Sequence, residues 1–272
     1  LLEKNLKEMI PDGRKYCSIL SGGIDSSLIS KILENISKPE FFISLNHIGK
    51  DKISNQISKF QKFFKNDINL IDVTLENYYD NLKDSLKICS SPISSHDFPG
   101  KLIIAREAKN KGCKAIFGGD GADELFGGYS TYFANIKNYK FNHSDYSRFF
   151  KNKIKLSVKG ELHFKNKLET LWNNYTKAYQ FLDKDEMSRQ TMMLLDTALQ
   201  LSSVGMRGTD LMFMSSAVEP RSVFLRKDII KFALNLPLKF KVDLSGKKEI
   251  RSKILLKKLF IKYFPKKLIF KK

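Results

Sequence analysis

The sequence predicts an α/β fold in which a parallel sheet, covered by helices on both faces, is followed by a mostly helical region. Two observations lead to this prediction. Up to about residue 129, short apolar runs alternate with segments of helical periodicity. Strands that alternate with helices form parallel sheets buried on both faces. Beyond residue 130 the strand patterns fade, whereas helical patterns continue.

Each element of the first half follows from a local pattern. Apolar runs of strand length are KYCSIL, FFISL, NLIDV and KAIFG, at residues 15–20, 41–45, 69–73 and 114–118. Leu28, Ile29 and Ile32 recur at helical spacing, which predicts a helix over residues 25–35. The segments between the other strands predict helices over residues 51–64, 75–88 and 101–111.

The second half is predicted to be helical, with helices in residues 147–156, 187–206 and 229–236. We place a boundary between residues 129 and 142, which divides the chain into an α/β core (1–135) and a helical region (136–272). This half is rich in methionine, which we interpret as core filler. These residues are Met187, Met192, Met193, Met206, Met212 and Met214.

The bulk composition is that of a globular protein with a proper core. The chain has 272 residues, of which 42% are hydrophobic, and no apolar run approaches the roughly 20 residues that span a bilayer. No signal peptide opens it, so the expected location is cytoplasmic. Cys17, Cys89 and Cys113 lie far apart without metal-site spacing, and we expect them to be buried thiols in a reducing compartment.

The net charge of +19 has two interpretations. A polyanionic partner such as nucleic acid is one of them. However, lysine is spread along the whole chain, and the only dense basic run is the C-terminal KKLFIKYFPKKLIFKK. Spread charge favours a lysine-rich composition over nucleic-acid binding. The aromatic residues of the C-terminal run could equally cover a core. The charge suits an ATP site without proving one.

The stretch SGGIDSS, residues 21–27, ends the first apolar run and begins a helix. A glycine turn at a helix N-terminus presents free backbone N–H groups, which form a ready site for phosphate or pyrophosphate. An ordinary strand-to-helix turn capped by Ser21 or Asp25 is the alternative, and the seven residues alone leave both open.

The stretch FGGDGADELFGGY, residues 117–129, holds five glycines and three acidic groups directly after a strand. A structural turn needs fewer glycines, so we expect a backbone that approaches a ligand closely, with carboxylates that hold magnesium. In parallel sheets, ligands bind beyond the carboxyl ends of the strands. Ser21, residues 44–46 and residues 118–120 all lie at such ends. The three loops are therefore predicted to meet in one crevice, which favours the phosphate interpretation.

Together, SGGIDSS and GGDGADELFGGY resemble the synthetase domain of glutamine-dependent asparagine synthetase, an N-type ATP pyrophosphatase of the PP-loop family. AVEPRSVFL (217–225) resembles the Leu-Glu-Val-Arg-Val-Pro-Phe-Leu segment of that family. Asp210, Met212 and Met214 match its Asp-Arg-Met-Ser-Met stretch, and Lys247 with Arg251 resembles its Lys-x-x-x-Arg element. The resemblance covers nearly the whole chain and implies a Rossmann-like, HUP-type sheet.

The resemblance also implies roles for individual residues. Pyrophosphate would be held by Ser21, Gly22, Gly23, Asp25, Ser26 and Ser27. Adenosine would contact Leu20, Ser44, Gly118 and Gly119, largely through backbone. Magnesium would lie near Asp25 and Asp123. Lys247 would neutralise the leaving pyrophosphate, with Arg251 beside it in the motif. Asp120 would be the base for incoming ammonia, and Glu124, Glu219 and Arg221 are candidates on the substrate side.

The implied function is ATP-dependent amide formation. A small carboxylate would be activated as an acyl-adenylate with release of pyrophosphate, and ammonia would then attack it. ATP and Mg²⁺ are the expected cofactors. Ammonia would come from a missing or separate glutaminase, because both ends of the chain look cut and no N-terminal cysteine glutaminase domain is present. A homodimer is one assembly that we consider, whereas a membrane partner is not expected and nucleic acid is disfavoured.

Departures from the family pattern bear mainly on the acceptor. Asp120 stands in place of a glutamate, Ser90 and Ser91 replace an acidic pair, and Arg226 replaces an aspartate. Val223 replaces a proline, and SHDFPG (95–100) matches the aspartate-pocket segment poorly. Other interpretations therefore stay open. The acceptor could be another carboxylate, such as a sugar acid or peptide. A PP-loop enzyme that modifies tRNA and a non-catalytic nucleotide-binding remnant are further alternatives.

Overall fold

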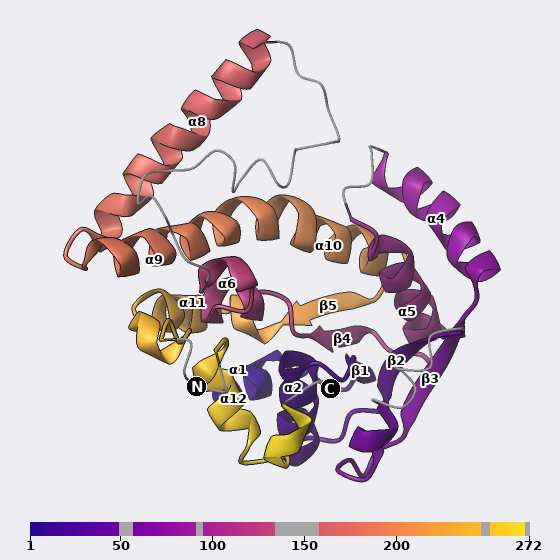
Figure 1. Ribbon diagram of the computed structural model, residues 1–272. Helices are drawn as coiled ribbons and strands as arrows, with labels where there is room; N and C mark the ends of the chain where they lie inside the picture. Colours follow the sequence, from indigo (N-terminus) through magenta and orange to yellow (C-terminus); the bar gives the residue numbers. More distant parts are fainter. Residues whose placement is uncertain (49–56, 91–94, 134–157, 246–250, 270–272) are drawn as a thin grey trace.

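A computed structural model describes residues 1–48, 57–90, 95–133, 158–245 and 251–269 of the chain. Its centre is a five-stranded sheet (Figure 1). The strands are β1 (Tyr16–Ile19), β2 (Phe42–His47), β3 (Ile68–Val73), β4 (Ala115–Gly118) and β5 (Glu219–Ser222).

All neighbouring strands of this sheet are parallel, and their order is β3-β2-β1-β4-β5. Ser18 of β1 pairs with Phe42 of β2 on one side and with Phe117 of β4 on the other. The chain runs outward from β1 to β3 and then returns to place β4 on the other side of β1. The α/β parallel fold predicted from the sequence is confirmed.

Helices cover both faces of the sheet and continue through the second half of the chain (Figure 1). The longer helices of the first half are α1 (Leu2–Met9), α2 (Ile24–Ile36), α4 (Leu75–Cys89), α5 (Phe98–Asn110) and α6 (Ala122–Phe126). Those of the second half are α8 (Val158–Thr176), α9 (Lys184–Asp196), the π-helix η3 (Thr197–Met206), α10 (Arg207–Met214), α11 (Lys227–Leu234) and α12 (Ile254–Phe260). Short 3₁₀ turns are η1 (Ser130–Tyr132), η2 (Lys177–Tyr179), η4 (Val223–Leu225), η5 (Leu238–Phe240) and η6 (Lys266–Leu268).

Two hydrophobic cores lie on the opposite faces of the sheet, because successive strand residues point to opposite sides. Tyr16 and Phe117 pack with Leu28 of α2 and Phe224 of η4 in one core. Cys17 of β1 and Ile116 of β4 pack in the other core, which α5 and α10 complete. Both faces are therefore buried, as expected of a parallel sheet.

The aromatic residues of the C-terminal basic run cover a third core. Phe260 and Phe264 are buried against Phe60, Phe64 and Phe42. The ring centroids of Phe60 and Phe264 lie 5.4 Å apart in an edge-to-face arrangement. Of the interpretations of this run, packing is the one that the structure supports.

The three cysteines and two of the methionines are buried, as the sequence predicted. Cys17, Cys89 and Cys113 are all buried and free. Met193 and Met212 are fully buried, whereas Met214 is half exposed. None of the helices in the described ranges is long and apolar enough to cross a membrane.

Other elements differ from the sequence prediction. Strand β5 was not predicted, and α5 begins at Phe98 rather than at residue 101. The helix expected over residues 51–64 is described only from residue 57 onward, and that over 147–156 lies outside the described residues. The division at residues 135 and 136 stays a prediction.

Candidate active site

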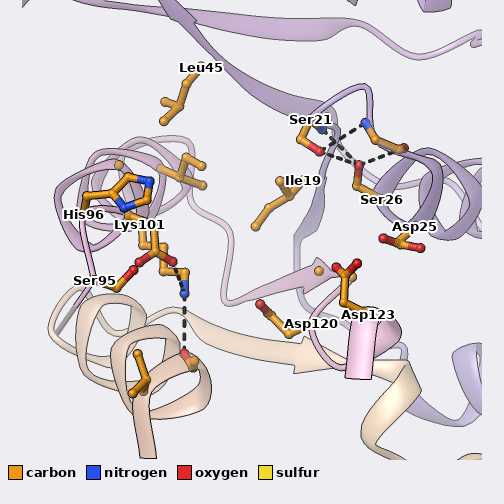
Figure 2. A pocket seen from close by; sticks show the side chains of 18 of the residues that line it. Ile19, Ser21, Asp25, Ser26, Leu45, Ser95, His96, Lys101, Asp120 and Asp123 are labelled. Atoms are coloured by element: carbon orange, nitrogen blue, oxygen red, sulfur yellow. Dashed lines mark hydrogen bonds and ion pairs between the residues drawn. The ribbon is translucent and has the colours of Figure 1, made fainter. Parts of the chain in front are cut away.

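The carboxyl ends of β1 to β4 open into one cavity of about 910 Å³. Ile19, Leu45 and Ile104 form an apolar part of its wall, and acidic side chains line the part near α2 and α6. Figure 2 shows the loop after β1, the start of α2, the loop after β4 and the start of α5 around the same space. The loops that were predicted to meet at this edge of the sheet do meet there. The cavity volume suits a nucleotide together with a second substrate.

The loop between β1 and α2 is closed by its own serines. The Oγ atoms of Ser21 and Ser26 lie 2.9 Å apart, and the backbone N–H of Ser21 donates to Ser26 Oγ at 3.1 Å. Gly22 has φ of +73°, which favours glycine. Gly23 is the N-cap residue of α2, and within the described chain no side chain caps this helix. Neither Ser21 nor Asp25 acts as the helix cap.

Gly119 allows the loop after β4 to lie directly on the first turn of α2. A Cβ atom at this position would come within 3.0 Å of Asp25 Cβ and 3.2 Å of the Ser26 nitrogen. Backbone cannot give way as a flexible side chain can, so only glycine fits without a shift. The close approach places the two glycine-rich loops against each other.

Lys253 joins the acidic groups of the two loops. Its Nζ lies 2.5 Å from Asp25 Oδ2 and 2.7 Å from Asp123 Oδ1. The Lys253 side chain is 10% exposed, so this ammonium is largely desolvated. Burial lowers the pKa of Lys253, but the carboxylates of Asp25 and Asp123 outweigh burial and raise the pKa overall. Lys253 is therefore a fixed cation beside two carboxylates that line the cavity.

The backbone around Lys253 is unusual for a lysine. Its φ of +49° lies in the left-handed region, which costs free energy for any residue with a Cβ. The residue precedes the first turn of α12, and its carbonyl accepts the N–H of Lys257 at 2.8 Å. A Cβ atom at Gly128 would collide with the side chains of Asp123 and Lys253. Gly128 thus leaves room for this ion pair.

Asp25 and Asp123 fit the requirements of a magnesium ion that arrives with nucleotide phosphates. Asp25 Oδ1 is buried and has no hydrogen-bond partner among the described residues, so it is an acceptor without a donor. Burial raises the pKa of Asp25, Lys253 opposes the rise, and Asp123 adds to it. No cluster of three acidic, histidine or cysteine ligands occurs in the described parts of the chain. Magnesium commonly uses one or two carboxylates plus substrate phosphates, so two suffice.

Asp120 faces the centre of the cavity from the loop after β4 (Figure 2). Its Oδ2 accepts a hydrogen bond of 3.3 Å from Ser222 Oγ of β5. Burial raises the pKa of the Asp120 carboxyl, whereas the Lys101 ammonium lowers it. A buried carboxylate with a raised pKa is a stronger base than an exposed one.

Comparisons with known proteins identify the family of the chain. The model of the family described as asparagine synthase matches residues 1–272 of the chain. The chain belongs to the asparagine synthase family. The relatives that it matches bear names of glutamine-hydrolyzing asparagine synthetases, and three of them are described. The protein of Methanocaldococcus jannaschii is 24% identical over 246 residues, which cover 88% of this chain and 36% of that protein.

The other two relatives are equally distant. The protein of Schizosaccharomyces pombe is 24% identical over 283 residues, which cover 95% of this chain and 41% of that protein. The nodule protein of Pisum sativum is 24% identical over 181 residues, which cover 61% of this chain and 29% of that protein. The chain thus spans less than half the length of these relatives.

Most of the predicted asparagine synthase residues border the cavity. Those that line it are Ser21, Gly23, Asp25, Ser26, Gly118, Gly119, Asp120, Asp123 and Glu124. Those described but not among the lining residues are Leu20, Gly22, Ser27, Ser44, Glu219, Arg221 and Arg251. Lys247 lies outside the described residues.

The three residues predicted on the substrate side each bind another group of the protein. Glu124 is 5% exposed and accepts a hydrogen bond of 2.7 Å from the Tyr129 hydroxyl. Arg221 of β5 donates to Glu219 at 3.0 Å and to the carbonyl of Met9. Both the Arg221 and Glu219 charges are thereby satisfied away from the lining residues, and their roles stay predictions.

Sequence reasoning missed Lys253 and the pair Asp97 and Lys101. The one local signal for Lys253 is its place before ILLKKLF, an apolar helical run. Asp97 lies in the segment that departs from the family pattern, Lys101 follows that segment in α5, and both line the cavity. The signal in the sequence was an aspartate and a lysine four residues apart, a spacing at which side chains on a helix interact.

Proposed function

We propose that the chain is an ATP-dependent synthetase that forms an amide from a carboxylate and ammonia. The observation that carries this proposal is that Asp25, Asp120 and Asp123 line one cavity at the carboxyl edge of the sheet, with Lys253 bound to both Asp25 and Asp123. A fixed cation beside two carboxylates and a glycine-rich loop suits pyrophosphate with its metal. The family membership supports the same activity.

The first step would activate the acceptor. An oxygen of the acceptor carboxylate attacks the α-phosphorus of ATP, the bond to the bridging oxygen breaks, and pyrophosphate leaves. The leaving group gathers negative charge, which Lys253 and the loop at residues 21–23 would stabilise where it develops. Magnesium, when bound near Asp25 and Asp123, would supply further neutralisation of the phosphate charge.

The second step would form the amide. Ammonia attacks the acyl carbon, AMP leaves, and one proton of the attacking nitrogen must be removed. Asp120 is the proposed acceptor of that proton because it faces the cavity and has a raised pKa. The apolar wall formed by Ile19, Leu45 and Ile104 would receive the adenine.

The acceptor and the amine source are part of the proposal. Aspartate is the acceptor that the family name implies. Another small carboxylate is the second candidate, and the departure of residues 95–100 from the aspartate-pocket segment of the family favours it. We propose that ammonia comes from a glutaminase unit, as in the names of the relatives, and that the reaction takes place in the cytoplasm.

A pyrophosphate-release screen tests the proposed function. The purified chain is incubated with MgATP, ammonium and individual carboxylates, beginning with L-aspartate, a sugar acid and a dipeptide. We expect one class of carboxylate to raise pyrophosphate release well above the ATP-only background, with a matching amount of amide by mass spectrometry. Nucleotide binding without release for any carboxylate would favour the nucleotide-binding remnant.

A further inference from the structure

The cavity wall carries an uneven set of charges. Among the described residues that line it, the carboxylates are Asp25, Asp97, Asp120, Asp123 and Glu124, and the only lysine or arginine is Lys101. The whole chain, in contrast, has a net charge of +19. An acceptor that carries carboxylates would meet strong repulsion here unless a cation receives it. Lys253 is already held between Asp25 and Asp123 at the pyrophosphate side.

Lys101 is a preformed cation at the opposite side of the cavity. Its Nζ lies 2.7 Å from Asp97 Oδ2 and 3.4 Å from the carbonyl oxygen of Gly205 in η3. The Phe98 ring centroid lies 6.0 Å from it. The side chain is 15% exposed. An ammonium has three N–H donors, and these two acceptors are the ones that the described residues provide. One donor direction is therefore available to a ligand.

Lys101 also borders the space in which the reaction would occur. Figure 2 shows Lys101 and Asp120 entering the same space, one from α5 and the other from the loop after β4. The charge of Lys101 reaches Asp120, because it lowers the pKa of that carboxyl. Arg221, the cation that the family resemblance put on the substrate side, is instead bound to Glu219 and to the Met9 carbonyl.

We propose that Lys101 determines acceptor specificity by binding an anionic group of the acceptor other than the carboxylate that is activated. This inference rests on the proposed function. A cation on the reacting carboxylate would withdraw charge from the oxygen that must attack phosphorus. A cation on a group that stays charged throughout instead binds ground state and transition state equally. The acceptor therefore carries a second anionic group such as a carboxylate, and the contact of Lys101 with that group contributes to KM rather than to kcat.

The test compares acceptors that differ by one carboxylate. Matched pairs are L-aspartate with β-alanine, and succinate with propanoate. We expect the wild type to prefer the dicarboxylate of at least one pair in kcat/KM. Lys101→Met should raise the KM of that dicarboxylate about 10- to 100-fold, since hydrogen bonds to charged groups are worth that much. The KM of the monocarboxylate should change little, and because Lys101 also lowers the pKa of Asp120, any change in kcat should be the same for both acceptors.

Two variants control for charge and folding. Lys111→Met removes a lysine at the far end of α5 that also pairs with an acid four residues away, Glu107. It should leave the preference intact. Lys101→Arg should retain part of the preference, and thermal unfolding of each variant checks the fold. An undiminished preference in folded Lys101→Met, or no preference in the wild type, would overturn the inference.

A binding arm separates this inference from the proposed function. Titration calorimetry measures the same acceptors with magnesium and α,β-methylene-ATP, which cannot release pyrophosphate. Lys101-dependent selectivity in binding, without turnover of ATP, would support the role of Lys101 and contradict the synthetase activity. Turnover of ATP with unchanged acceptor selectivity in Lys101→Met would support the synthetase activity and contradict the role of Lys101.

Discussion

Asp120 is the residue for which a catalytic and a structural role predict different kinetics. If Asp120 accepts the proton of the amine, Asp120→Asn should still form the acyl-adenylate but should slow amide formation by about 10²- to 10⁴-fold. Single-turnover rapid quench with radiolabelled ATP follows the two steps separately. Because burial raises the pKa of Asp120, amide formation should fall, as pH is lowered, at a higher pH than for an exposed aspartate.

The structural role is tested by a partner of Asp120. Ser222 Oγ donates to Asp120, so Ser222→Ala removes the brace and keeps the carboxylate. Ser222→Ala should affect both steps only mildly, and Asp120→Glu should keep or raise amide formation if the acceptor is aspartate. Equal loss of both steps in Asp120→Asn, with lower thermal stability, would remove the catalytic role and leave an aspartate that braces a turn.

At the residue scale, the sequence was most informative where function needs a local pattern. SGGIDSS and GGDGADELFGGY contain all of the predicted residues that line the cavity. Lys253 could not be found in this way, because its role depends on a left-handed backbone and on contacts with residues far away in the chain. Local patterns carry no information on which distant lysine reaches a given carboxylate.

At the scale of elements, Lys241 links the end of η5 to α9, and the pH dependence of the unfolding free energy should report this contact. Its Nζ donates to Gln190 Oε1 at 2.7 Å, and burial lowers the pKa of Lys241 to about 7 against the opposing charge of Glu186. Between pH 7 and about 10 the unfolded chain therefore binds more protons than the folded one. Stability should rise with pH in this window, by about 2 kcal/mol from pH 7 to 9.

Chemical denaturation of the wild type and Lys241→Met at pH 7 and 9 measures this contribution. The variant should lack the rise, whatever its stability at pH 7, where loss of the Gln190 hydrogen bond opposes relief of the buried charge. The exposed Lys239→Met should retain it. Identical pH dependence in Lys241→Met and the wild type would show that Lys241 stays charged in the fold.

The elements that the sequence did not predict owe their structure to their neighbours. Strand β5 has the sequence Glu-Pro-Arg-Ser, which has low strand propensity, and it forms at the sheet edge by pairing with β4. The helical pattern of residues 187–206 predicted a helix but not its change to π geometry at Thr197. Such π segments often occur at functional sites, and η3 supplies the carbonyl that binds Lys101.

At the scale of the whole molecule, the distribution of charge connects fold and proposed function. The surface charge of a protein with a net +19 attracts anions such as ATP and carboxylates from solution. The cavity itself is lined by carboxylates, so an anionic ligand must either bind together with a cation or contact a lysine of the protein. In the proposed function, Lys253, bound to Asp25 and Asp123, serves the pyrophosphate, and Lys101 on the cavity wall serves the acceptor.

We propose that the acidic cluster with Lys253 binds the pyrophosphate of MgATP. Acceptor-dependent exchange of labelled pyrophosphate into ATP measures this binding in Asp25→Asn, with the exposed Asp12→Asn as the matched control. Circular dichroism and thermal unfolding check that both variants are folded. We predict that Asp25→Asn reduces exchange at least about 100-fold, whereas Asp12→Asn exchanges like the wild type. Normal exchange by folded Asp25→Asn would show that this carboxylate has no part in binding pyrophosphate.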